Sequence, residues 1–267
     1  MTDERYDFDP PDVGRLFRVD GEVALVTGGG TGIGRMAARV LARAGAKVIV
    51  TDIDGAAAER VAAEITGEGL AAASYAMDVA READIVSVFD AVRRDHAPVS
   101  ILFNNAGISK RAPAEELTLE AWNAVLDVNL TGVFLCAREA GKHMLGLGRG
   151  SIINVSSMWG HAGGGYYGNA SYHATKSAVI GLTRALAVEW GPRGIRVNDI
   201  APTFLKTRIT EPLFANPDML EDLEAFAPLR RTGVPADLAG AVLYLASPAS
   251  GLVTGASLRV DAGWTAR

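Results

Sequence analysis

A tyrosine and a lysine that stand four residues apart could together perform acid–base chemistry. Tyr172 and Lys176 fall in a segment expected to be helical, and side chains at this spacing share one face of a helix. A free phenol titrates near pH ~10. A lysine ammonium about 4 Å away, at an effective dielectric constant of about 20, would favour the phenolate by about 4 kcal/mol, or about three pKa units. Tyr172 would then titrate close to neutral pH, where acid–base catalysis is most effective.

An isolated Tyr/Lys pair is more often an ordinary solvated pair on a helix surface, so the interpretation depends on the motifs around it. Two nearby tyrosines, Tyr166 and Tyr167, have Ala170 and Ser171 four residues further on and therefore lack a lysine partner. We interpret both as pocket or packing residues.

A glycine-rich turn, residues 28–34, stands between an expected strand and an expected helix, which is the context that a dinucleotide-binding motif requires. In such a motif Gly28 permits the tight turn, Gly32 lets the backbone approach a pyrophosphate, and Gly34 lets the helix pack closely on the sheet. The free N–H groups and the positive end of the helix dipole would face the phosphates. The alternative, a flexible surface loop, does not explain the strongly patterned strand and helix on either side.

The choice between the two nicotinamide dinucleotides depends on the end of the second expected strand. Asp52 stands there, 18 residues after Gly34. A carboxylate in this place can accept hydrogen bonds from the ribose hydroxyls and would repel a 2′-phosphate. Positions Thr31 and Ile53 carry no neutralising cation, and Arg35 opens the helix and is expected to point away. The sequence therefore favours NAD over NADP.

The elements that must position these residues alternate regularly along the chain. Short β-branched runs at 23–27, 47–51, 72–77, 99–103, 151–155, 195–200 and 257–260 predict strands. Longer Ala-rich amphipathic runs at 33–44, 55–66, 82–95, 118–145, 171–190 and 236–246 predict helices. The strands are almost continuously apolar, as expected of a parallel sheet covered on both faces. We therefore predict an α/β fold, a single-domain Rossmann-type doubly wound parallel sheet of about seven strands with helices on both faces.

The domain organisation is predicted to be simple. Residues 1–19, which begin with an Asp-rich stretch, form an N-terminal arm, and residues 20–267 form the dinucleotide-binding domain. Two segments break the rhythm of strands and helices, the Gly-rich loop 158–170 and the irregular, partly helical insertion 203–228. Long loops in a compact domain are more often functional than structural, so we expect both to shape a substrate pocket.

The composition excludes several other classes of function. A net charge of −5 provides no footprint for nucleic acid or an anionic membrane. The N-terminus lacks the basic start and apolar stretch of a signal peptide, and no apolar run reaches the ~18 residues needed to span a bilayer. The single cysteine, Cys136, lies in an apolar run and is interpreted as a buried hydrophobe, which suits the cytoplasm. No group of residues has metal-ligand spacing, so no metal is expected.

Several motifs, taken together and in order, give the chain its resemblance to the short-chain dehydrogenase/reductase family, from about residue 20 to 265. They are the turn 27–34, Asp78-Val79, the segment 104–107, Asn129, Ser157, Tyr172 with Lys176, Asn198 with Pro202, the segment 253–255 and Asp261. The chain departs from the family pattern at Thr203 and at Ala262, where the family usually has glycine.

The resemblance implies roles for individual residues. The catalytic set would be Asn129, Ser157, Tyr172 and Lys176. In it, Ser157 donates to the substrate oxygen, Lys176 also bonds the nicotinamide ribose, and Asn129 holds a water that links Lys176 to solvent; Asn129 also stands out by itself as a poor residue for a helix interior. The cofactor-binding set would be Gly28, Thr31, Gly32, Ile33, Gly34, Asp52, Ile53, Asp78, Val79, Asn105, Ala106, Gly107, Tyr172, Lys176, Pro202, Thr203, Leu205 and Thr207. Substrate contacts are expected from Trp159, His161, Tyr167 and Phe204, with Trp264 nearby.

The resemblance also implies a reaction and an assembly. We expect an NAD-dependent oxidoreductase that interconverts a secondary alcohol and a ketone and works in the cytoplasm as a homotetramer. Its chain end and overall pattern resemble the polyol and sugar-acid dehydrogenases of the family. A cyclic, aromatic or steroid-like alcohol and a 3-oxoacyl thioester remain alternative substrates. A nucleotide-sugar epimerase and a non-catalytic dinucleotide sensor remain alternative functions.

Overall fold

The first strand, β1 (Val23–Thr27), shows why this sequence forms a sheet that is buried on both faces. All five of its residues are buried. Successive side chains of a strand point to opposite faces. Ala24 and Val26 accordingly join the hydrophobic core on one side, and Val23 and Leu25 join the core on the other. Such a strand requires helices on both faces.

The computed structural model describes residues 11–164, 168–207 and 210–267. Seven parallel strands form one sheet in the order β3-β2-β1-β4-β5-β6-β7. After β1 their bounds are β2 (Lys47–Asp52), β3 (Ala72–Ala76), β4 (Ile101–Asn104), β5 (Gly150–Val155), β6 (Ile195–Pro202) and β7 (Ser257–Val260).

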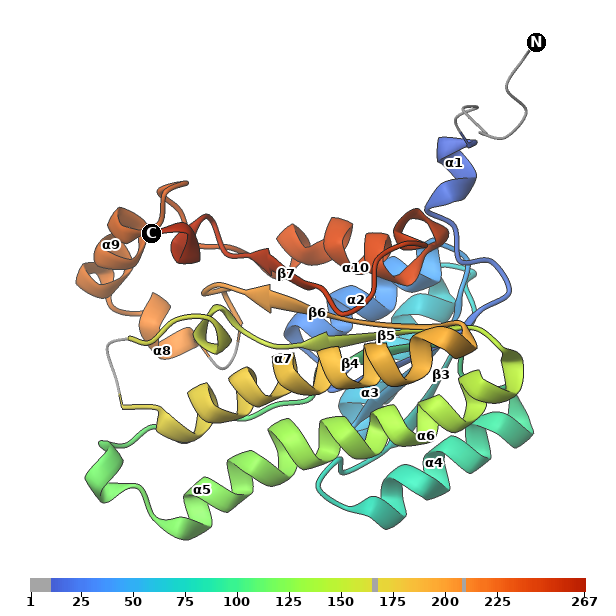
Figure 1. Ribbon diagram of the computed structural model, residues 1–267, viewed down its shortest axis with the longest axis horizontal. Coiled ribbons are helices and arrows are strands. Elements are labelled where there is room, and N and C mark those ends of the chain that lie inside the picture. Colours follow the sequence, from blue (N-terminus) through green and yellow to red (C-terminus); the bar gives the residue numbers. More distant parts are fainter. Residues whose placement is uncertain (1–10, 165–167, 208–209) are drawn as a thin grey trace.

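Helices cover both faces of this sheet (Figure 1). One face carries α2 (Gly32–Arg43), α3 (Gly55–Gly67) and α10 (Ala239–Ala246), and the other carries α4 (Glu82–Asp95), α6 (Gly132–Leu147) and α7 (Ala170–Trp190). The remaining helices are α1 (Val13–Leu16), α5 (Leu119–Leu126), α8 (Glu211–Phe214) and α9 (Pro217–Phe226). The predicted single-domain, doubly wound Rossmann-type fold is confirmed.

Two predicted helices differ in detail from those in the structure. The helix predicted over 118–145 begins as expected with Thr118 as its cap, whose Oγ1 accepts a hydrogen bond from the Ala121 N–H at 3.2 Å. It is then divided by a π-helical segment, Asp127–Thr131, between α5 and α6. The helix predicted from residue 236 starts with the 3-10 turn Pro235–Leu238 before α10. The insertion after β6 is partly helical, as predicted, and contains α8 and α9.

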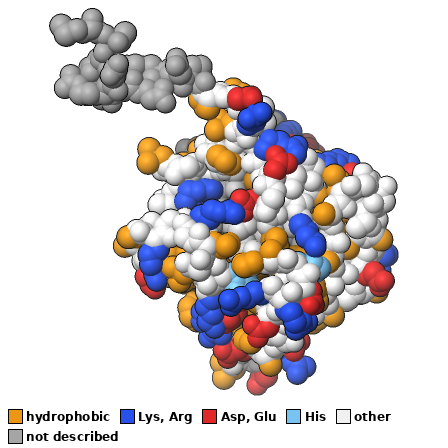
Figure 2. Space-filling model, turned by 90° about the vertical axis from the view of Figure 1, so that its right-hand side faces the viewer, with side chains coloured by type: hydrophobic (Ala, Val, Ile, Leu, Met, Phe, Trp, Pro, Cys, Tyr) orange, Lys and Arg blue, Asp and Glu red, His pale blue; other side chains and the backbone are white. Residues whose placement is uncertain are grey.

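The N-terminal segment is only partly separate from the domain. Within the described residues, α1 contributes no buried side chain, but Val19 is buried in the core beside α2. The division at residue 19 stays a prediction. On the face that Figure 2 shows, basic and acidic side chains are intermingled rather than gathered into fields of one sign.

The strand order determines where a ligand can bind. The chain runs from β1 outward through β2 and β3 on one side, and then returns to place β4 on the other side of β1. Ligands of open α/β sheets bind at such a reversal, in the crevice beyond the carboxyl ends of the strands. The glycine-rich turn follows β1 and Asn105 follows β4, so both lie at this crevice.

Candidate active site

The glycine-rich turn is fitted closely against its neighbours. A Cβ on Gly34 would lie 2.1 Å from the carbonyl oxygen of Gly28, a contact that no side chain can make. Gly32 has a φ of +52°, in the left-handed region that glycine adopts without strain. The residues thus satisfy two steric conditions for a backbone that approaches a pyrophosphate.

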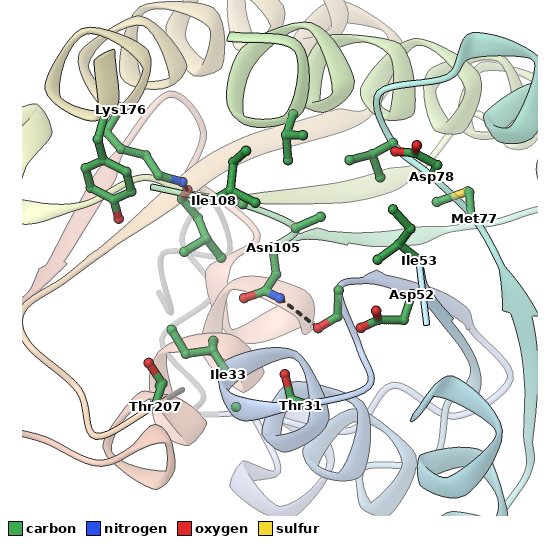
Figure 3. Close-up of a pocket in the computed structure, with 18 residues that line it drawn as sticks. Thr31, Ile33, Asp52, Ile53, Met77, Asp78, Asn105, Ile108, Lys176 and Thr207 are labelled. Atoms are coloured by element: carbon green, nitrogen blue, oxygen red, sulfur yellow. Dashed lines mark hydrogen bonds between the residues drawn. The ribbon is translucent and has the colours of Figure 1, made fainter. Parts of the chain in front are cut away.

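The segment after β4 fastens this turn in place. Asn105 donates from Nδ2 to the carbonyl oxygens of Thr27 (3.0 Å) and Gly28 (3.1 Å), and the latter residue is part of the turn itself. The hydroxyl of Thr27 accepts from the backbone N–H groups of Asn105 (2.9 Å) and Ala106 (3.0 Å). Figure 3 shows Asn105 between the two ends of the cavity described below. The turn is therefore held rigidly before any ligand binds.

A cavity of about 330 Å³ extends from this turn along the carboxyl ends of the strands. Fourteen of the residues predicted to bind the cofactor line it: Gly28, Thr31, Gly32, Ile33, Asp52, Ile53, Asp78, Val79, Asn105, Ala106, Gly107, Tyr172, Lys176 and Thr207. Met77, Ile108, Val128 and Val155 also line it and were missed, although the first three directly neighbour motif residues and Val155 stands two residues before Ser157. Gly34, Pro202, Thr203 and Leu205 do not line it; Gly34 lies behind the turn, and Pro202 and Leu205 are buried at the end of β6.

One end of the cavity carries acidic and apolar groups suited to an adenosine. Asp52 accepts the Gly30 N–H at Oδ2 (2.9 Å) and the Asp54 N–H at Oδ1 (3.0 Å), so the carboxylate is held at the rim. Ile53 beside it is 72% exposed and offers an apolar surface. Figure 3 shows Asp52, Ile53, Met77 and Asp78 grouped at this end and Lys176 at the other.

Arg35, the cation in the first turn of the helix that follows the glycine-rich turn, is paired with a carboxylate of another helix. Arg35, the fourth residue of α2, forms an ion pair with Glu64 of α3 at 2.8 Å. This pair draws the guanidinium toward α3, as the sequence predicted. A 2′-phosphate at Asp52 would therefore meet a carboxylate without help from this arginine.

Tyr172 and Lys176 lie one turn apart on α7, at the other end of the cavity. Lys176 Nζ is 5.6 Å from the centroid of the Tyr172 ring and donates to the Val155 carbonyl oxygen at 2.7 Å. Ser157 is the second residue after β5, is buried, and forms a hydrogen bond with Tyr172. Ser157 Oγ also accepts the Trp159 N–H at 3.2 Å, which orients the hydroxyl. The predicted serine, tyrosine and lysine are thus brought together.

The predicted net lowering of the Tyr172 pKa to near neutrality is wrong. Burial raises the pKa of Tyr172 above its ordinary value, and the groups that oppose this increase are the Ser157 hydrogen bond and the charge of Arg111. Burial also lowers the pKa of Lys176 to about 8, although the charge of Asp199 opposes this. The prediction counted the ammonium and left out desolvation, which disfavours both charged forms.

Asn129 is buried within the π-helical segment and binds the loop after β4. Its Oδ1 accepts the Ile108 N–H at 2.8 Å, and its Nδ2 donates to the Ile108 carbonyl at 2.9 Å. The amide therefore fixes the backbone that lines the cavity next to Gly107. π-helical insertions are frequent at functional sites. Its predicted role in holding a water for Lys176 stays a prediction.

The two irregular loops meet over the tyrosine end of the site in a group of aromatic rings. The Trp159 ring lies 5.1 Å from His173, 5.9 Å from Phe204 and 6.0 Å from Trp264, centroid to centroid. Trp159 and Phe204 are thus placed together, and Trp264 joins them from the C-terminal segment; their contact with a substrate stays a prediction. Tyr166 and Tyr167 lie outside the described residues. His161 Nε2 is instead hydrogen-bonded to Ser257 Oγ on β7 at 2.8 Å.

Other residues have no part in this site. Burial raises the pKa of Cys136 to about 12, in keeping with an inert hydrophobe. Across the part of the chain that the structure describes, no three His, Cys, Asp or Glu residues are grouped as metal ligands. The same residues include no helix long and apolar enough to cross a membrane.

Known proteins share both this sequence and this fold. The sequence model of the family described as enoyl-(acyl carrier protein) reductase matches residues 28–265. D-threitol dehydrogenase from Mycolicibacterium smegmatis is 39% identical, over 93% of this chain and 95% of the relative. Galactitol 2-dehydrogenase (L-tagatose-forming) from Cereibacter sphaeroides is 41% identical, over 94% and 97%. The crystal structure of a gluconate 5-dehydrogenase from Burkholderia cenocepacia J2315, in complex with NADP and tartrate, has a TM-score of 0.93 and 37% identity, over 96% of this chain and 100% of that one.

Proposed function

The chain belongs to the short-chain dehydrogenase/reductase family, and on that premise we propose that it is an NAD-dependent dehydrogenase that interconverts a secondary alcohol and a ketone. The observation that carries this proposal is the placement of Tyr172 and Lys176 in the same cavity as the glycine-rich turn, with Ser157 bonded to the tyrosine. A dinucleotide sensor would need the turn but not this set of acid–base groups.

The chain's own groups account for the proton side of the reaction. The substrate oxygen lies between Ser157 and Tyr172, where the serine hydroxyl donates to it and stabilises the charge that develops. Tyr172 accepts the hydroxyl proton during oxidation and returns it during reduction. Lys176 holds a positive charge beside the phenol and favours its ionised form. The bound nicotinamide supplies the hydride acceptor, and the protein supplies orientation and electrostatics.

NAD is the cofactor that we propose, held by the turn 28–34, by Asp52 and by Asn105 to Gly107. Asp52 supports NAD because its carboxylate suits ribose hydroxyls and opposes a phosphate, and because Arg35 is paired with Glu64. The structures of some relatives contain NADP, as the gluconate 5-dehydrogenase does. The preference therefore has to be tested on this chain.

Replacing Asp52 by asparagine is expected to change the cofactor preference. Removal of the carboxylate charge relieves repulsion of a 2′-phosphate, and kcat/KM for NADP should increase at least about tenfold relative to NAD, which corresponds to about 1.4 kcal/mol. Steady-state rates with both cofactors measure this ratio.

Asp54→Asn is the matched control for this prediction. Asp54 stands two residues away, and its Oδ1 accepts the Ala57 N–H at 3.1 Å as the cap of α3. Because asparagine caps a helix about as well as aspartate, this replacement should change stability little and leave the cofactor ratio unchanged. An unchanged ratio in Asp52→Asn would remove Asp52 from the choice of cofactor.

The substrate that we propose is a polyol, a sugar or a sugar acid. Support comes from the relatives named for threitol and galactitol, and from the gluconate 5-dehydrogenase structure. The wall of Trp159, Phe204 and Trp264 is compatible with this class, because aromatic rings pack against the apolar faces of sugars while loop polar groups bind hydroxyls. Cyclic alcohols and a 3-oxoacyl thioester belong in the same substrate panel, since 39% and 40% identical relatives carry those names.

We further propose that the enzyme works in the cytoplasm as a homotetramer. The single cysteine is buried and requires no oxidising compartment. Exposed apolar side chains stand on the helices expected to form the subunit contacts, with Phe134 on α6 and Val188 on α7. Light scattering at micromolar concentration is expected to give four times the chain mass of 28.0 kDa, and the mass of one chain would contradict the assembly.

A further inference from the structure

A buried carboxylate behind the catalytic lysine has no part in the reaction described above. Asp199 lies in the middle of β6 and is 0% exposed, and it is the one acidic residue of a strand in which five of the other seven residues are apolar. Burying a charged carboxylate costs several kcal/mol unless charges and hydrogen bonds compensate for it. Such a residue therefore needs a reason to be there.

The hydrogen bonds of Asp199 connect two different parts of the molecule. Its Oδ1 accepts from the hydroxyls of Ser156 and Ser257, the latter at 2.6 Å. Ser257 Oγ is in turn bonded to His161 Nε2 at 2.8 Å. A chain of hydrogen bonds thus runs from the exposed His161 through the half-buried Ser257 to the fully buried Asp199.

The inner end of this chain adjoins the lysine site. Ser156, which bonds Asp199, directly precedes the catalytic Ser157 and directly follows Val155, whose carbonyl accepts from Lys176 Nζ. The Lys176 side chain is only 3% exposed, so its ammonium is also isolated from water. The buried Lys176 and the buried Asp199 are therefore bonded to consecutive residues, Val155 and Ser156, at the carboxyl end of β5.

Burial raises the pKa of Asp199 above its ordinary value, and the hydrogen bonds from Ser156 and Ser257 and the charges of His161 and Arg184 oppose that increase. Both Arg184 and Lys176 lie on α7, and the charge of Asp199 acts to raise the pKa of Lys176. Both hydroxyls donate to one oxygen, an arrangement that favours the carboxylate form. Within the described residues, Oδ2 has no hydrogen-bond partner, so neighbouring positive charges must stabilise it.

We propose that Asp199 is a positioning residue of the active site: its carboxylate is the buried counter-charge that keeps Lys176 protonated, and the Ser257–His161 chain links that carboxylate to the surface. The consequence for the reaction is direct. A lysine in so apolar a place would otherwise lose its proton near neutral pH, and a neutral amine does not favour the phenolate of Tyr172. The importance of the Lys176 charge for catalysis rests on the proposed function. The contacts of Asp199 do not, because they involve no substrate.

The proposal can be tested on the full chain without turnover. Lysine labelled at its ε carbon reports the pKa of Lys176 by NMR, with the signal assigned by its loss in Lys176→Arg. The wild-type protein should titrate near the value of about 8, and Asp199→Asn should lower it by about one unit or more. Ser257→Ala, which keeps the carboxylate but removes one donor to it, should lower the pKa of Lys176 far less. A folded Asp199→Asn protein with an unchanged Lys176 titration would overturn the proposal.

If Asp199→Asn does not fold, the proposal can be tested on the wild-type protein. Aspartate labelled at its carboxyl carbon should show Asp199 ionised at neutral pH, with its signal assigned by its shift in Ser257→Ala. The pH dependence of this signal should also differ between the wild-type protein and His161→Gln, a substitution at an exposed position. An Asp199 that stays protonated, or the same curve with and without His161, would contradict the proposal.

Rate measurements add a second signature that separates charge from packing. Lys176 must be protonated, so activity is lost as pH rises through its pKa. In Asp199→Asn that alkaline limb should move to lower pH by the same shift that NMR reports, whereas a loss of packing alone would lower kcat at every pH without moving the limb. If the wild-type protein oxidises no alcohol, the proposed function fails while the NMR result still decides the role of Asp199.

Discussion

Tyr172→Phe is expected to reduce kcat for alcohol oxidation by about 10²- to 10⁴-fold, the usual contribution of a positioned acid–base group. The substitution removes one oxygen and keeps the ring, so packing beside Lys176 is preserved. Without the phenol, none of the described residues at the site is placed to accept the substrate proton in its stead, since Ser157 serves as a donor. Cofactor affinity, measured by the fluorescence of bound NADH, should change little, because the glycine turn and Asp52 are untouched.

Tyr75→Phe is the matched control for this prediction. Tyr75 lies on β3, and its hydroxyl is bonded to His96 Nε2 at 3.1 Å, remote from the cavity. The same loss of one oxygen there should leave kcat and KM essentially unchanged. Full activity in Tyr172→Phe would disprove the assigned role of the tyrosine, and equal losses in both variants would point to destabilisation.

Gly34→Ala should have the second large effect, on both cofactor binding and stability. The added methyl would lie 2.1 Å from the Gly28 carbonyl oxygen, which is backbone and cannot move aside without displacing the turn from α2. Overpacking of this kind costs about 1–3 kcal/mol. We expect a lower melting temperature and a Kd for NADH at least tenfold higher, which calorimetry and fluorescence titration measure.

Gly67→Ala provides the comparison for this variant. Gly67 is the last residue of α3, and an added Cβ there meets nothing within 4 Å. Alanine should be neutral or stabilising by up to about 1 kcal/mol, with unchanged NADH affinity. If Gly34→Ala matched Gly67→Ala in melting temperature and Kd, the turn would not be the tight cradle described above.

The parts of the fold that depend on local pattern were predictable from the sequence. Six of the seven strands contain β-branched residues in short, largely apolar runs, and β3 follows from a weaker run of small and aromatic residues. The helices follow from amphipathic periodicity and caps such as Thr118. The π-helical interruption at Asp127–Thr131 was not predicted, because apolar periodicity continues through it; its Asn129 accepts from the distant Ile108, a contact that only the folded chain shows. The strand predicted from Val99 begins at Ile101 in the structure, because pairing with neighbouring strands decides where a strand begins.

The candidate site likewise has residues that could be predicted from the sequence and properties that could not. The glycine turn, Asp52 and the Tyr172–Lys176 pair are short-range motifs, and the structure places all of them in one cavity. The direction of the Tyr172 pKa was wrong because it depends on burial by segments far away in sequence. Asp199 was missed, although a lone acidic residue within an apolar strand was a visible signal. Its link to His161 joins three segments that only the folded chain brings together.

The most direct test of the central claim is a screen of polyols, sugar acids and cyclic alcohols with NAD, followed by the absorbance of reduced nicotinamide. Threitol, galactitol and gluconate head the panel because relatives carry their names. The account predicts that at least one of these alcohols reduces NAD with the wild-type protein and that the signal disappears with Tyr172→Phe. NAD reduction that persists at the same rate in Tyr172→Phe, or its absence with every alcohol in the panel, would contradict the account.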